Sequence, residues 1–158
     1  MDFHLPTVEE IAQYLRPSFR KDCTVFYSGE GTGDEALEFA KARDYHHWYH
    51  FSEMIALHYG IDPYHVHNDV NDDLQSRICQ AYGLAASGKV YVFLSSAPLT
   101  KSTFWTRDEW PALQVNPAVT EIVSVSLIEG VYSEITIFVK GQAPKPWPLA
   151  VEEPEPGT

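Results

Sequence analysis

The segment from Lys89 to Leu94, Lys-Val-Tyr-Val-Phe-Leu, constrains the fold of this chain more than any other segment. After its first residue it contains only apolar and aromatic side chains, which favour a strand. A strand without alternating polar residues is expected to be buried on both faces, as in parallel sheets that are covered by helices. A second buried strand is predicted over residues 23–27, and the helical patterns between the two strands would form the crossover that a parallel pair requires.

Helical periodicity predicts four helices, over residues 8–15, 34–43, 51–59 and 72–86. The first is preceded by Thr7, with Glu10 three residues later in capping-box spacing. Residues 95–117 lack such a pattern and are expected to be mostly loop.

Two further strands are predicted near the C-terminus, over residues 121–128 and 134–140. The connection between them is too short for a parallel crossover, so the two strands are expected to form an antiparallel hairpin. The chain is therefore predicted to be an α/β domain with a small central, mainly parallel sheet, a helical layer and a C-terminal hairpin. The 158 residues fit one domain over residues 1–143, followed by a Pro/Glu-rich tail over 144–158 that is expected to be loose.

The net charge of −11 argues against electrostatic binding to nucleic acid or to an anionic membrane surface. No stretch has the roughly 18 apolar residues of a membrane span, and the N-terminus lacks the pattern of a signal peptide. The expected location is the cytoplasm, or outside the cell as part of a larger exported protein.

The loops after the two buried strands, residues 28–33 and 95–109, are the predicted location of a ligand site. Strands 23–27 and 89–94 are expected to be parallel, so both loops would emerge at the same edge of the sheet. In open α/β sheets, ligands bind in the crevice at that edge.

Three motifs in this order resemble the ADP-ribosyl cyclase and NAD glycohydrolase family. They are an aromatic-Ser-Gly turn at residues 27–29, an Ala-Ala-x-x-x-Val-x-Val junction at residues 85–92, and a Ser-Thr-Phe loop at residues 102–104 followed by acidic residues. The resemblance extends from Cys23 to Leu127. It implies an enzyme that cleaves the nicotinamide–ribose bond of NAD, with NAD as substrate and no other cofactor.

The resemblance assigns roles to individual residues. Glu109 matches the catalytic glutamate, which contacts the ribose hydroxyls beside the scissile bond. The residues predicted to bind substrate are Tyr27, Ser28, Gly29, Trp48, Glu53, Ser102, Thr103, Phe104 and Trp105. No residue is assigned to a metal.

The sequence also departs from the family pattern. One additional residue lies between Phe104 and Glu109, so Asp108 competes for the catalytic role. The second stacking tryptophan of the family is absent from its usual place, and Trp48 or Trp105 is expected to replace it. The family's disulfides are missing, which leaves cyclisation and plain hydrolysis both open.

A single carboxylate suffices for this chemistry. The leaving group of NAD is a pyridinium, which departs as neutral nicotinamide, so no general acid has to protonate it. The group that must be stabilised is an oxocarbenium-like ribose, and a preorganised anion would stabilise it. A toxin or defence effector with an inhibitor or immunity protein as partner would fit this activity. The alternative is a catalytically silent nucleotide-binding or protein-interaction domain on the same fold.

Two simpler interpretations involve histidine and cysteine. His46 and His50 have helical i,i+4 spacing and His65 and His67 lie close together, but no glutamate or cysteine completes a zinc motif. Cys79 lies within a predicted helix, where a free cysteine is usually a small buried apolar residue rather than a nucleophile.

Overall fold

The structure is a computed structural model that describes residues 6–29, 31–61, 72–94 and 103–148. Its helices are α1 (Val8–Leu15), the short 3-10 helix η1 (Arg16–Ser18), α2 (Thr32–Arg43), α3 (Trp48–Tyr59), α5 (Asp72–Ala85), the π-helical turn η2 (Trp105–Glu109) and α6 (Trp110–Val115). Its strands are β1 (Thr24–Ser28), β2 (Gly88–Leu94), β3 (Val119–Ile128) and β4 (Val131–Val139). No helix among these residues is long and apolar enough to cross a membrane.

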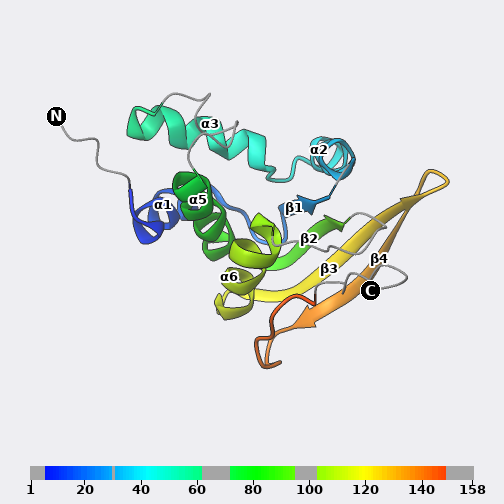
Figure 1. The fold of residues 1–158 in the computed structure, drawn as a ribbon. Coiled ribbons are helices and arrows are strands. Elements are labelled where there is room, and N and C mark those ends of the chain that lie inside the picture. The colour runs from blue at the N-terminus through cyan, green and yellow to red at the C-terminus, as the bar shows by residue number, and fades with distance from the viewer. Residues whose placement is uncertain (1–5, 30, 62–71, 95–102, 149–158) are drawn as a thin grey trace, which may run out of the picture.

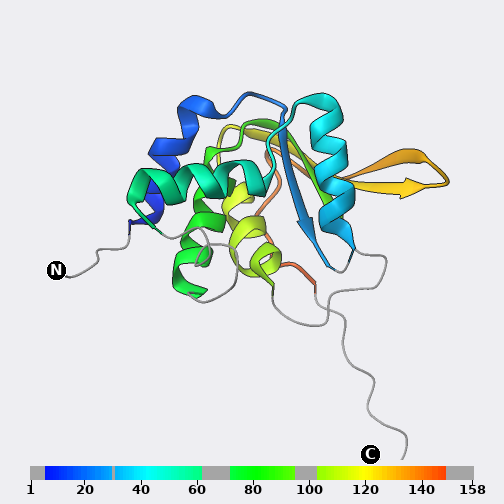
Figure 2. The ribbon, with the colours of Figure 1, turned by 90° about the horizontal axis from the view of Figure 1, so that it is seen from above.

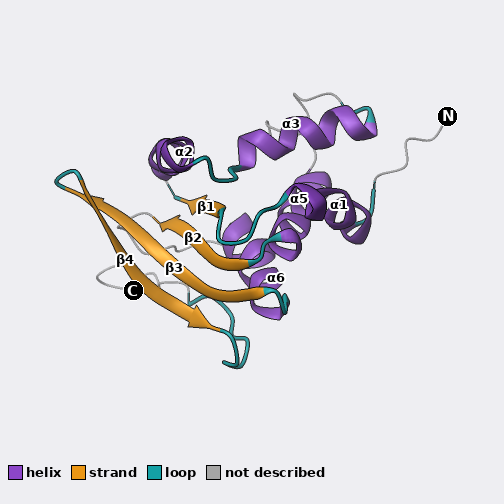
Figure 3. Cartoon of the chain, turned by 180° about the vertical axis from the view of Figure 1, so that it is seen from behind, coloured by secondary structure: helices purple, strands orange, loops and turns teal. Residues whose placement is uncertain are grey.

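The four strands form one sheet in the order β1-β2-β3-β4 (Figures 1 and 3). The β1–β2 and β2–β3 pairs are parallel, and β3 and β4 form an antiparallel hairpin. The predicted α/β class, the parallel central strands and the C-terminal hairpin are therefore confirmed.

Strands β1 and β2 contribute to apolar clusters on both faces of the sheet, because successive side chains point to opposite sides. Phe26 and Val92 join a large apolar cluster with α1, α3, α5 and α6 on one face. Val25 and Phe93 join a smaller cluster on the other face, which is covered by α2. Figure 2 shows α2 beside β1, while the end of the β3–β4 hairpin projects beyond the helices.

The first helix begins and ends as the sequence predicts. The Thr7 hydroxyl accepts a hydrogen bond from the Glu10 N–H, and the Glu10 carboxylate accepts one from the Thr7 N–H. This reciprocal capping box satisfies N–H groups that the first turn of a helix cannot satisfy internally.

The segment after β2 differs from its prediction, because residues 104–115 are helical rather than loop. Thr103 caps the start: its N–H donates to the Thr106 hydroxyl at 2.8 Å, and the Thr106 N–H donates to the Thr103 hydroxyl at 3.3 Å. The wide π-helical turn over Trp105–Glu109 disrupts regular helical spacing, which explains why the apolar pattern did not reveal the helix.

The start of the Pro-rich C-terminal segment packs against this helix. The Lys145 carbonyl accepts hydrogen bonds from the Trp110 indole and the Gln114 amide, and the Lys145 N–H donates to Gln114 at 3.0 Å. Trp147 adds edge-on ring contacts with Trp105 and Trp110. The first residues of this segment, as far as Trp147, therefore pack against the domain.

Candidate active site

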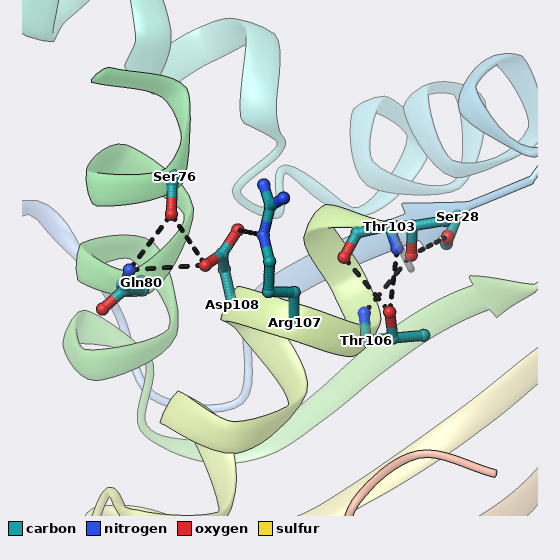
Figure 4. A network of polar contacts seen from close by, with 7 residues as sticks. All are labelled: Ser28, Ser76, Gln80, Thr103, Thr106, Arg107 and Asp108. Atoms are coloured by element: carbon teal, nitrogen blue, oxygen red, sulfur yellow. Dashed lines mark hydrogen bonds and ion pairs between the residues drawn. The ribbon is translucent and has the colours of Figure 1, made fainter. Parts of the chain in front are cut away.

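The carboxyl end of β1 and the start of the 104–115 helix meet at one edge of the sheet. The Ser28 hydroxyl donates a hydrogen bond to the Thr103 hydroxyl at 3.3 Å (Figure 4). Ser28 is buried and Thr103 is half-buried. Two residues that are far apart in the sequence, and that were both predicted to bind substrate, therefore come together where parallel α/β sheets bind ligands.

The turn after Ser28 is built from glycines at positions that require positive φ. Gly29 has φ 104°, and Gly31, the residue before α2, has φ 80°. The Thr32 hydroxyl donates to the Gly29 carbonyl at 2.7 Å and closes the turn. Gly33 adds a different constraint, because a Cβ there would lie 3.3 Å from the Tyr27 ring. The missing side chain lets α2 pack closely against Tyr27.

Asp108 is buried and fully engaged in polar contacts (Figure 4). Its carboxylate accepts hydrogen bonds from the Ser76 hydroxyl at 2.7 Å, the Gln80 amide at 3.3 Å and the Arg107 guanidinium at 3.2 Å. Ser76 and Gln80 lie on α5, so this network joins η2 to that helix. The contacts give Asp108 a structural role as the anchor of the turn.

Glu109 is also buried, at 7% exposure, but its environment is different. The pKa of Glu109 is raised to about 8. The main cause is burial in a poorly solvated site, the second is the neighbouring charge of Asp108, and a hydrogen bond with the Cys79 side chain offsets part of the rise. The Glu109 carboxyl group is therefore mostly protonated at neutral pH in the free protein. A buried acid with a strongly shifted pKa is more typical of a functional site than of a structural one.

The surroundings of Glu109 combine aromatic rings with unpaired polar groups. Burial and the charge of Glu109 raise the pKa of Tyr82 well above its ordinary value. Among the described residues, neither the Tyr82 hydroxyl nor the Trp105 indole N–H has a hydrogen-bond partner. Half-buried Trp48 contacts the Tyr82 ring edge-on, with the ring centroids 6.5 Å apart. Buried polar groups without partners are rare, and the Tyr82 hydroxyl near the buried acid marks a position that could receive a polar atom.

Tyr27 and Trp105, both predicted to bind substrate after parallel strands, do not face each other across one cleft. Tyr27 packs with the α2-side cluster and stacks on His47 at 5.3 Å, whereas Trp105 belongs to the cluster on the opposite face. The prediction followed the two loops to one edge of the sheet but overlooked the alternation along β1, which directs Tyr27 and Phe26 to opposite faces.

Trp105 does not lie at the surface, where it could contact a substrate. It is 1% exposed and packs against Phe26, Trp110 and Trp147, with ring centroids 5.7–6.0 Å apart. An aromatic ring enclosed in this way has no free face on which a substrate could stack. Trp48, the other candidate for that role, lies on the same side as Glu109 and keeps part of its surface exposed.

The remaining predicted residues are distributed as follows. Phe104 is half-buried beneath the Arg107 guanidinium, 5.1 Å from the ring centroid. Glu53 is exposed on α3. Ser102 lies outside the described residues.

The described histidines and cysteines do not form a metal centre. No group of three or more potential metal ligands occurs within the part of the chain that the structure describes. His46 accepts a hydrogen bond from the Arg20 N–H at 2.7 Å, so one of its ring nitrogens has a structural partner. The side chain of His50 and the residues His65 and His67 are not described.

Two residues around Glu109 were not predicted as part of a site. Cys79 is buried, as expected, and burial raises the pKa of its thiol well above the ordinary value. Tyr82 was assigned only to the apolar face of its helix. Both occur at helical spacing on α5, so the sequence alone offered no signal that they face the acid.

Comparison with family models, with curated proteins and with solved structures gave no match to this chain. The interpretation of the site therefore depends on its own geometry and on the resemblance of the sequence motifs.

Proposed function

We propose that the protein cleaves the nicotinamide–ribose bond of NAD, with Glu109 as the catalytic carboxylate. The single observation that supports this most strongly is the burial of Glu109 beside Tyr82, with Trp48 nearby. If Glu109 pointed into solvent, a silent binding domain would be favoured; a buried acid beside aromatic rings favours the enzyme.

The proposed reaction needs Glu109 as an anion. Nicotinamide would leave with the electrons of the scissile C–N bond, and the ribose carbon would become cationic. The ionised carboxylate of Glu109 would stabilise that cation, and water or another group of the substrate would then attack it. The pyridinium charge of bound NAD favours the ionised form of a nearby carboxyl group, so substrate binding would lower the pKa of Glu109 below its value of about 8 in the free protein.

The contacts of the two adjacent acids support Glu109 over Asp108. Asp108 already accepts three hydrogen bonds from protein side chains, whereas Glu109 interacts with the weaker donor Cys79. A carboxylate that binds substrate hydroxyls should retain free acceptor capacity, which Asp108 has largely used.

Binding of the rest of NAD is proposed for the sheet edge nearby. The hydroxyls of Ser28 and Thr103 and the backbone around Gly29 can bind a pyrophosphate without any cationic side chain. Such a local arrangement suits a protein whose overall charge is negative.

The test compares three isosteric variants with the wild type in an NAD cleavage assay read by chromatography. Glu109→Gln should reduce turnover by about 100-fold or more, because it removes the charge and preserves the shape. Asp108→Asn should reduce it much less. Glu38→Gln, which makes the same chemical change at an exposed position on α2, should leave it unchanged.

Two outcomes would overturn the proposal. Full activity in Glu109→Gln together with loss in Asp108→Asn would move the catalytic role by one residue. Intact NAD after prolonged incubation with the wild-type protein would favour the silent nucleotide-binding or protein-interaction domain.

A further inference from the structure

The outer strand β4 has an open edge and an apolar surface, neither of which the proposed activity uses. It is the last strand of the sheet, with only β3 hydrogen-bonded to it among the described elements. Ile128, Val131 and Ile135 are each more than 60% exposed on the hairpin. Open edges of this kind pair readily with another strand unless the sequence prevents it.

Protection of the β4 edge is confined to its C-terminal end. There the register with β3 is interrupted between Ile122 and Val123, and the Val139 N–H donates to the Gln142 side chain at 2.9 Å. The remaining stretch, residues 131–136, contains no proline, no lysine and no break in register. Its one charged residue, Glu134, is neutralised within the sheet by Lys89 at 2.6 Å. The usual devices that block edge pairing are therefore missing from this stretch.

The exposed apolar residues lie on one face of the hairpin. The register pairs Ile128 with Val131 and Ser124 with Ile135, and side chains of directly paired residues share a face. Residues 131, 133 and 135 alternate along β4 and hence point to that same face. The end of the hairpin that carries these residues extends beyond the helical layer (Figure 2).

We propose that two copies of this chain associate by antiparallel pairing of their β4 edges around a two-fold axis at Ser133. In this register Val131 lies opposite Ile135 of the second copy, and the same pair recurs on the other side of the axis. Two continuous apolar rows would then run across both hairpins. In each row, Ile128 and Val131 of one copy are followed by Ile135 of the other copy. Isologous contacts of this kind are the commonest form of protein self-association.

The charges of β4 are compatible with this register. Glu134 lies opposite Tyr132 of the second copy, so no like charges face each other across the new pair. The only charge on the segment is already paired with Lys89. The overall charge of −11 opposes association at long range, so pairing should strengthen as salt screens it. The argument for a second copy is the register itself, which places apolar residues opposite apolar residues and no like charges opposite each other. The proposal does not depend on the proposed activity.

The experiment is sedimentation of the full chain over a wide concentration range, at low and high salt. The wild type should show a concentration-dependent dimer that is favoured by salt. Val131→Lys and Ile135→Glu should each weaken association by about tenfold or more, because each places a charge against an apolar side chain of the second copy. Leu57→Lys, at an exposed position on α3, should leave association unchanged.

The double variant V131K/I135E tests the register itself. The introduced lysine and glutamate are too far apart on one strand to pair with each other. Across the proposed axis, however, the lysine at position 131 of one copy lies opposite the glutamate at position 135 of the other. Dimerisation should therefore return, and it should then weaken as salt screens the new ion pairs.

Folding of the variants can be verified separately, because positions 57, 131 and 135 are all exposed and circular dichroism would detect any loss of structure. A wild type that remains monomeric at every concentration would overturn the proposal. Single variants that dimerise normally, or a folded double variant that stays monomeric, would overturn it as well.

Discussion

The helix-covered part of the molecule and the β3–β4 hairpin both depart from the usual pattern of buried apolar and exposed charged side chains, but in opposite ways. On the helix-covered half, the interior holds two adjacent carboxyl groups, Asp108 and Glu109. On the hairpin half, the surface exposes Ile128, Val131 and Ile135. Neither arrangement is the one expected to maximise stability, since charged groups are costly to bury and exposed apolar side chains gain nothing. Departures from local rules of this kind are expected where a protein binds or reacts, and each half therefore has its own functional hypothesis.

The largest contrast should come from truncating an aromatic residue of the covered half. Trp105→Ala should lower the free energy of unfolding by about 3–5 kcal/mol, because the ring is enclosed by Phe26, Trp110 and Trp147. Denaturant titration measures this directly. Phe104→Ala, at the half-buried neighbouring position, is the matched control and should cost clearly less. Equal losses at both positions would show that Trp105 does not belong to the core.

The pH dependence of stability should reveal the protonation of Glu109. Its pKa is about 8 in the folded protein against an ordinary value of 4.5, so the folded state retains a proton that the unfolded state releases between these values. The stabilising contribution is complete below the unfolded pKa and is lost as pH rises through about 8. The wild type should lose on the order of 5 kcal/mol over this window relative to Glu109→Gln. Parallel pH profiles for the two proteins would contradict the assignment.

Removal of the Asp108 charge should have an intermediate effect. Asp108→Asn loses the charge-assisted hydrogen bonds from Ser76, Gln80 and Arg107 and should destabilise the fold by about 1–3 kcal/mol. Thermal unfolding of the variant beside Ser76→Ala would measure it. If Asp108→Asn melts like the wild type, the network is not an anchor between η2 and α5.

The smallest effect is expected on the hairpin. Ile128→Thr keeps a β-branched side chain at a position that is 62% exposed, so the free energy of unfolding should change by no more than about 0.5 kcal/mol at low protein concentration. A loss as large as that of Trp105→Ala would mean that this surface is covered within the same chain.

The sequence predicted those parts of the fold that depend on local signals. The apolar run of β2, the capping box at Thr7 and the short hairpin connection each specify their element through nearby residues. The helix over residues 104–115 was missed because its π-helical turn shifts the spacing of apolar side chains.

The candidate site was predicted less completely because it depends on side-chain direction. The meeting of Ser28 with Thr103 followed from the parallel strands and was anticipated. The placement of Tyr27 and Trp105 on opposite faces depends on the phase of alternation in β1, which the loop argument did not use. Cys79 and Tyr82 approach Glu109 only through the packing of η2 on α5, and no local pattern encodes that contact.

The most direct test of the central claim is the rate of NAD cleavage by the wild-type protein as a function of pH. Purified protein would be incubated with NAD across a series of buffers that span the Glu109 pKa of about 8, and the products separated by chromatography. The account predicts release of nicotinamide together with ADP-ribose or its cyclic form. It further predicts that kcat/KM rises with pH until the carboxyl group of the free protein is ionised. NAD that remains intact at every pH, in a protein shown to be folded, would contradict the account.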